Sequence, residues 1–148
     1  MLSQKAKYAL RALIVLASRP DRALSAAAVA EAARVPTKFL EQILGELRVA
    51  GLVASQRGRH GGYRLARPAE SITFAAVIRL VDGPIAPLPC LSQTAYRRCA
   101  DCADEANCAI RRAFADVVVA SRQALDATTI AAARDFDPAP PLATVPDR

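Results

Sequence analysis

All four cysteines of the chain fall in one short stretch, as Cys90, Cys99, Cys102 and Cys108. Thiolates are the soft ligands that iron–sulfur clusters and zinc prefer in proteins. A cluster of thiols this dense is uncommon in a chain that leaves its cysteines unused. The stretch therefore predicts a cysteine-ligated metal site or a group of redox-active thiols.

Four interpretations of the cysteines remain open from the residues alone. The spacing C-x8-C-x2-C-x5-C differs from the usual pair-and-pair zinc pattern. The spacing therefore favours an iron–sulfur cluster over zinc. A reversible disulfide is a further option, and four free reduced thiols are another. We see no signal peptide and no run of the roughly 18–20 apolar residues that spans a membrane, so we expect a cytoplasmic protein without membrane contact, in which cysteines stay reduced.

The charge of the chain is unevenly distributed. The 148 residues carry a formal net charge of +6. Residues 1–68 hold 12 Lys and Arg against 4 Asp and Glu, whereas residues 69–148 hold 8 against 10. A basic N-terminal part attracts polyanions because neutralised phosphates release their counterions. A charge that serves only solubility would give the same composition.

Hydrophobic periodicity predicts a mainly helical chain with one small hairpin. A first helix starts near Ser3 and ends before Arg19-Pro20-Asp21, a second spans about 25–33 after Ser25 as N-cap, and Thr37 caps a third that Gly51 ends. Strands are expected at 52–55 and 62–65, around a basic, glycine-rich turn. Thr73 caps a helix over 74–81, a long helix starts near 105, and a Pro-rich tail follows.

Two short helices followed by a hairpin with a basic tip are typical of a winged helix-turn-helix, which binds double-stranded DNA. The third helix would enter the major groove, and the hairpin, or wing, would enter the minor groove. The expected DNA-binding residues are Lys5, Lys7, Arg11, Thr37, Lys38, Glu41, Gln42, Arg57, Arg59 and His60. His60, the only histidine, is expected to serve there and not as a metal ligand.

Three segments resemble the IscR/NsrR-type family of bacterial winged-helix regulators, also called the Rrf-two family. They are KYALRAL (7–13), KFLEQILGELRVAGLV (38–53) and RGRHGGYRLAR (57–67). The resemblance implies a homodimer joined by the long helix, palindromic operators, base reading by Glu41 and minor-groove entry of Arg57. The wing departs from the commoner RGPGGGY pattern, because Arg59 and His60 stand where Pro and Gly are usual.

The resemblance also favours an iron–sulfur cluster over the other sites. Members that bind a cluster place three cysteines in this loop, and Cys102-x5-Cys108 matches their last interval, with Cys90 as first ligand. The fourth ligand of some members is a histidine, where this chain has Arg111, and of others a carboxylate, where it has Lys7. Cys99 is therefore the expected fourth ligand, and the cluster would be 2Fe-2S or 4Fe-4S. The alternative is a site with three cysteine ligands and one open iron position.

These expectations define a mainly α fold with a small β-wing, in which a winged helix-turn-helix domain precedes a long dimerisation helix. The expected parts are the DNA-binding domain (1–82), the cluster loop (83–104), the dimerisation helix region (105–132) and a flexible tail (133–148). The function would be transcriptional regulation, with DNA binding modulated by a cluster that senses redox state, nitric oxide or iron. The first alternative is a zinc- or thiol-based redox regulator. The sequence favours a redox carrier or a protein–protein adaptor less. No enzymatic motif is present, so no catalytic residue is expected.

Overall fold

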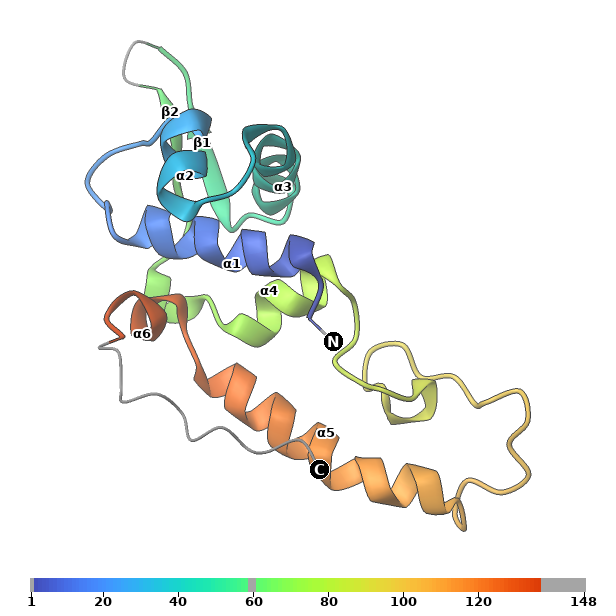
Figure 1. Ribbon diagram of the computed structural model, residues 1–148. Coiled ribbons are helices and arrows are strands. Elements are labelled where there is room, and N and C mark those ends of the chain that lie inside the picture. Colours follow the sequence, from blue (N-terminus) through green and yellow to red (C-terminus); the bar gives the residue numbers. More distant parts are fainter. Residues whose placement is uncertain (1, 59–60, 137–148) are drawn as a thin grey trace.

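The computed structural model describes residues 2–58 and 61–136. Arg59 and His60, both expected to contact DNA, lie outside the described residues, as do residues 137–148. The elements are α1 (Gln4–Ala17), α2 (Ala26–Ala33), α3 (Thr37–Val49), β1 (Val53–Gln56), β2 (Gly62–Leu65), η1 (Ala69–Ser71), α4 (Phe74–Val81), η2 (Pro89–Leu91), α5 (Ala109–Ala127) and α6 (Ile130–Arg134). The described part is a mainly helical fold with one two-stranded antiparallel sheet (Figure 1).

Side-chain caps fix where most of the helices begin. The hydroxyls of Ser3, Ser25 and Thr73 each accept a hydrogen bond from the backbone N–H three residues later. These bonds satisfy N–H groups that have no partner within the helix. The caps expected at Ser25 and Thr73 are confirmed. The cap expected at Thr37 is wrong: α3 begins at Thr37 itself, its N-cap is Pro36, and no side chain caps it.

The hairpin is fixed to the start of α2 by a close backbone approach. Leu24 and Tyr63 exchange two backbone hydrogen bonds of 2.9 and 2.7 Å, and so extend the sheet by one bridge. Gly62 precedes Tyr63 with a φ of 150°, and a Cβ there would collide with the Leu24 carbonyl. Glycine is therefore required at position 62, because a side chain would separate the hairpin from the helices.

One hydrophobic core unites α1, α2, α3, the hairpin, η1, α4 and α6. Its fully buried large side chains are Leu13, Leu16, Leu40, Leu44, Leu47, Ile72, Ile130, Val29, Val53 and Val77. We call this body, residues 2–82 together with α6, the head. The apolar faces of α1 and α3 supply half of these side chains, as the 3.6-residue periodicity of the two helices indicates.

The long helix α5 and the hairpin lie on opposite sides of α1 and α4 (Figure 1). It begins at Ala109 and not near residue 105, because Asp104 accepts hydrogen bonds from the Ala106 N–H and the Asn107 side chain in a separate turn. It ends at Ala127. In the described part of the chain, no helix is long and apolar enough to cross a membrane.

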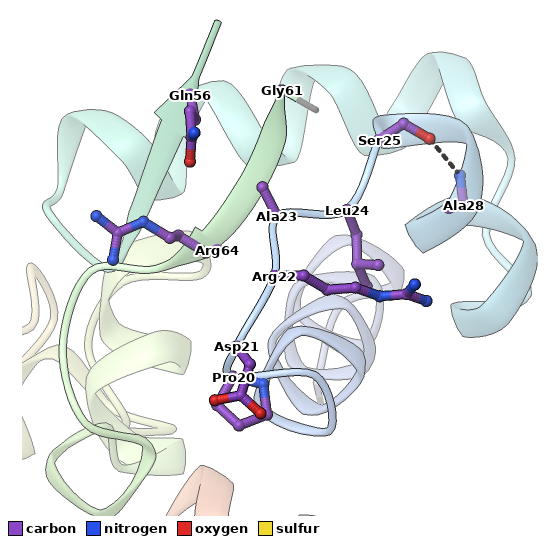
Figure 2. Close-up of a pocket in the computed structure, with 10 residues that line it drawn as sticks. All are labelled: Pro20, Asp21, Arg22, Ala23, Leu24, Ser25, Ala28, Gln56, Gly61 and Arg64. Atoms are coloured by element: carbon purple, nitrogen blue, oxygen red, sulfur yellow. Dashed lines mark hydrogen bonds between the residues drawn. The ribbon is translucent and has the colours of Figure 1, made fainter. Parts of the chain in front are cut away.

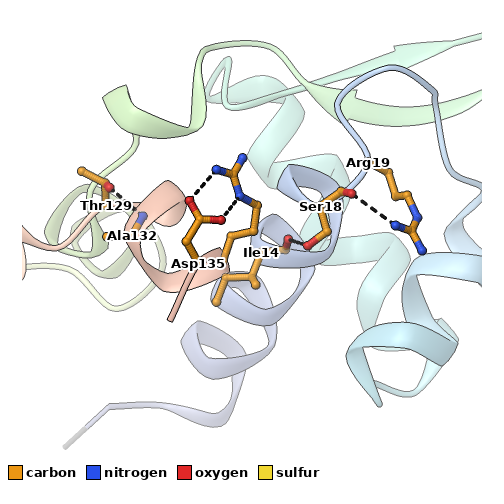
Figure 3. A network of polar contacts seen from close by, with 7 residues as sticks. Ile14, Ser18, Arg19, Thr129, Ala132 and Asp135 are labelled. Atoms are coloured by element: carbon orange, nitrogen blue, oxygen red, sulfur yellow. Dashed lines mark hydrogen bonds and ion pairs between the residues drawn. The ribbon is translucent and has the colours of Figure 1, made fainter. Parts of the chain in front are cut away.

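After α5 the chain returns to the head. Thr129 caps α6 through the Ala132 N–H at 3.1 Å (Figure 3), and the Ile130 N–H donates to the Ile72 carbonyl at 2.8 Å. Ile130 is fully buried in the core. Residues 133 and 134, which the sequence assigned to a tail, therefore belong to a helix that packs on α1.

Candidate nucleic-acid interface and cysteine segment

Helix α3 has one buried face and one polar face. Its buried face consists of Leu40, Ile43, Leu44 and Leu47. The four residues expected to read DNA from this helix, Thr37, Lys38, Glu41 and Gln42, are all exposed. Packing of the apolar face on α1 and α2 therefore turns these polar side chains outward together, as a recognition helix requires.

The charge of Lys5 is already partnered within the chain. Its ammonium lies 2.7 Å from Oε2 of Glu46, and Oε1 of Glu46 also accepts a weaker bond of 3.4 Å from the Gln42 amide. The pair connects the first turn of α1 to α3. Lys7 and Arg11 lie on the exposed face of α1.

A hollow of about 690 Å³ lies between the hairpin and the start of α2 (Figure 2). Its lining includes Arg22, Arg64 and Ser25, and the two guanidinium groups extend in opposite directions in this view. Arg57, the expected wing arginine, is exposed at the adjoining turn. Arg22 and Arg64 were not among the residues expected to contact DNA, although the alternation of side chains along a strand could have placed Arg64 on the outer face.

The cysteine segment, residues 83–108, is folded back on itself. The Arg97 N–H donates to the Pro89 carbonyl at 3.2 Å, and the Cys102 N–H donates to the Cys99 carbonyl at 3.2 Å. Cys90 is buried within η2, whereas Cys99 and Cys102 are half-buried. None of the four cysteines is in a disulfide.

The Cys90 and Cys99 thiols lie near each other, and Cys108 begins α5. Desolvation raises the pKa of the Cys99 thiol, and the neighbouring Cys90 thiol raises it further, with smaller contributions from Cys102 and Asp101. Cys108 is the N-cap of α5, where its sulfur accepts a bond from the Arg111 N–H at 3.4 Å. The fold therefore brings Cys99 near Cys90 and places Cys108 at the helix start.

The thiols have the chemistry of cluster ligands without being gathered for a metal ion. Within residues 2–58 and 61–136, no three His, Cys, Asp or Glu side chains lie close enough together to hold one. One turn after Cys108, the buried Nε of Arg111 lacks a hydrogen-bond partner among the described residues. Because a buried donor without a partner is costly, this part of the protein favours the binding of a group that accepts hydrogen bonds.

Helix α5 exposes a stripe of apolar side chains over its N-terminal half. Ile110 is 61% exposed, Phe114 41% and Val117 56%. Val118, the next residue, is instead buried within the chain. A helix with this exposed face needs a partner in water.

A helix pair, a basic hairpin and a cysteine segment on one chain define a winged helix-turn-helix regulator. A sequence profile of the Rrf2 family, described as iron-dependent transcriptional regulators, matches residues 2–134. The chain belongs to this family, whose members are transcriptional regulators and not enzymes.

Individual relatives agree with the family. A helix-turn-helix regulator called rrf2-like, from Rhodobacter capsulatus, is 47% identical over 134 residues, which are 88% of this chain and 89% of the relative. The structure of CymR, described as the global cysteine regulator of B. subtilis, matches with a TM-score of 0.77 and 30% identity over 93% of this chain and 98% of CymR. The IscR structure from T. potens matches with a TM-score of 0.70 and 27% identity, over 88% and 83% of the two chains. The winged-helix fold and the resemblance are confirmed.

Proposed function

We propose that this regulator binds palindromic DNA as a homodimer and that an iron–sulfur cluster on its cysteine segment controls the affinity. The observation that carries the DNA-binding part is the outward polar face of α3 beside a basic hairpin. A helix fits the major groove, and the exposed Arg57 lies where a wing would meet the minor groove. Lys7, Arg11, Arg22 and Arg64 would contact phosphates.

The exposed stripe on α5 supports the homodimer. Two copies of one helix can cover each other around a twofold axis, which matches the symmetry of a palindromic operator. In this proposal residues 1–82 bind DNA, 83–104 form the sensor loop and 105–132 join the subunits. Residues 133 and 134 end α6, and the rest of the segment 133–148 would form the tail. The protein would act in the cytoplasm.

The cluster would be held by Cys90, Cys99, Cys102 and Cys108, as 2Fe-2S or 4Fe-4S. A bound cluster supplies one-electron chemistry and a reaction centre for oxidants and nitric oxide. The iron-dependent description of the family and the four unbridged thiols support it. Because the thiols are not gathered as they stand, binding would be coupled to rearrangement of residues 90–108.

A thiol- or zinc-based sensor is the second candidate. The contact between Cys90 and Cys99 favours it, because neighbouring thiols can be oxidised to a disulfide. The likeness to CymR of Staphylococcus aureus points the same way, because one of its structures is described as the oxidized form.

Two measurements test the proposal. Anaerobically purified protein is analysed for iron, sulfide and zinc together with its visible spectrum. Iron and sulfide with sulfide-to-iron absorbance support the cluster, whereas a colourless, zinc-loaded protein overturns it. Binding is then measured to a duplex selected from a random-sequence library. Arg57→Ala should weaken binding, and failure of the wild type to bind any duplex, with or without iron, overturns the whole proposal.

A further inference from the structure

Arg122 on α5 contacts the backbone on both sides of the first cysteine. Its Nε donates to the Ile85 carbonyl at 3.1 Å, and its Nη2 donates to the Leu91 carbonyl at 2.6 Å. Cys90 lies between these two carbonyls in the chain and is 6% exposed. One planar guanidinium therefore holds both ends of the stretch that buries Cys90, which the single ammonium of lysine cannot do in the same geometry.

The same arginine lies beside an ion pair that reaches the head. Asp126 follows Arg122 by one helical turn and accepts two hydrogen bonds from Arg79 of α4, at 2.8 and 2.9 Å. The positive charge of Arg122 also stabilises the Asp126 carboxylate. Asp126 thus stands between a guanidinium that holds the cysteine segment and one that belongs to the DNA-binding domain.

The C-terminal end of α4, which carries Arg79, is also bonded within the head. The C-cap of α4, Asp82, accepts from the Ser3 backbone N–H at 2.9 Å and from the Ser3 hydroxyl. Helix α4 is therefore attached to α5 through Arg79 and to the start of α1 through Asp82. These polar contacts, together with the backbones of α5 and α4, connect the Cys90 stretch to the helix that carries Lys5.

We propose that Arg122 is the positioning residue for Cys90 and that Asp126 and Arg79 transmit the position of the cysteine segment to the DNA-binding domain. The first half concerns the conformation of the chain itself. The second half rests on the proposed function, because it requires DNA binding to respond. The two halves make separate predictions.

Thiol labelling of the reduced, metal-free full chain tests the positioning role. Iodoacetamide labelling is followed by mass spectrometry, with Cys108 as internal reference. In Arg122→Ala, Cys90 should label roughly tenfold faster than in the wild type, the opening expected when a hydrogen bond to a charged group is lost. Arg112→Ala, an exposed change on the same helix, should leave Cys90 labelling unchanged. Equal Cys90 labelling in Arg122→Ala and wild type overturns the positioning role.

Arg122→Lys separates this role from a general effect on folding. It keeps the charge on α5 but cannot hold both carbonyls, so its Cys90 labelling should fall between those of wild type and Arg122→Ala. Full protection of Cys90 in Arg122→Lys would mean that a positive charge at position 122 is enough, and it would overturn the proposal that Arg122 must hold both carbonyls. Hydrogen exchange of the backbone amides in residues 85–91 of Arg122→Lys gives a second measure. The proposal requires these amides to exchange faster than in the wild type.

Asp126→Asn tests the connection to the head. It leaves the Arg122 carbonyl bonds in place, so Cys90 should stay protected while affinity for the library-selected duplex changes severalfold. Unchanged affinity in both Asp126→Asn and Arg122→Ala overturns transmission. A wild type that binds no duplex would defeat the proposed function and, with it, transmission, while leaving the labelling result intact.

Discussion

The Lys5 ammonium lies 2.7 Å from the Glu46 carboxylate and so connects the first turn of α1 to α3. Both side chains are 41% exposed, so the pair contributes about 0–1 kcal/mol to stability. Its main effect is on the distribution of charge, because it neutralises one of the cations that the sequence assigned to DNA.

This pairing predicts unequal effects for two lysines on DNA binding. Lys38→Gln should weaken binding and reduce the salt dependence, the slope of log K against log salt, by about one, the value of a lost phosphate contact. Lys5→Gln should change the slope much less, because Glu46 already neutralises Lys5. Binding titrations at several salt concentrations measure both slopes. An equal loss of slope in the two variants would show that Lys5 leaves Glu46 to contact phosphate.

Gly62 gives a prediction about stability. Gly62→Ala should lower the free energy of unfolding by about 1–3 kcal/mol, because it combines a strained φ with a clash against the Leu24 carbonyl. Gly45→Ala is the matched control: within α3 it has open space around it and should raise stability by up to about 1 kcal/mol. Urea unfolding measures both. A neutral Gly62→Ala would argue that the hairpin is not fixed to residue 24.

The exposed stripe on α5 gives a prediction about assembly. Phe114→Glu should convert the proposed homodimer to a monomer, because a charge at a helix–helix contact is desolvated without a partner. Gln123→Glu adds the same charge on the opposite side of α5 and should leave the dimer intact. Light scattering after size-exclusion chromatography measures the mass. A dimer that persists in Phe114→Glu would place the subunit contact elsewhere.

The Arg79–Asp126 ion pair gives a pH dependence. The hydrogen bonds from Arg79 hold the pKa of Asp126 below its usual range, and the charges of Arg79 and Arg122 add to this. A lowered pKa in the folded state stabilises the protein above the ordinary aspartate pKa of about 3.9, and this stabilisation is lost as the pH falls through the lower folded value. The stability difference between wild type and Asp126→Asn should therefore be constant near neutral pH and shrink below about pH 4.

Unfolding in urea across this pH range measures that difference. Asp116→Asn, an exposed change on the same helix, serves as control for the loss of one carboxylate. A wild-type advantage over Asp126→Asn that grows on acidification would contradict the assigned direction.

Local sequence signals accounted for most of the head. Ser25 and Thr73 are caps whose effect depends only on the next three residues, and Gly51 has the positive φ expected after α3. The N-cap is Pro36 and not Thr37, because α3 begins one residue earlier than the position of the Thr37 hydroxyl suggested. Tertiary contacts decided the rest: α6 forms because Ile130 fills the head's core, and short-range patterns do not report such a partner.

The candidate site divides in the same way. The outward placement of Lys38 and Glu41 follows from helical periodicity and was predictable. The partnering of Lys5 by Glu46 was not, because the two residues are 41 positions apart. Arg122 likewise lacks any local signal, since its acceptors are backbone carbonyls of a loop far away in the sequence.

The return of α6 into the head has a geometric consequence for signalling. A helix of 19 residues is roughly 28 Å long, so Cys108 sits at the distal tip of a rod whose base is built into the DNA-binding body. A small rotation at the C-terminal end of α5 moves Cys108 through a large distance. Conversely, a displacement of Cys108 rotates the C-terminal end of α5 through only a small angle. In the proposed dimer, a change in the proposed cluster at this tip would therefore be suited to fine adjustment of the spacing between the two DNA-binding heads.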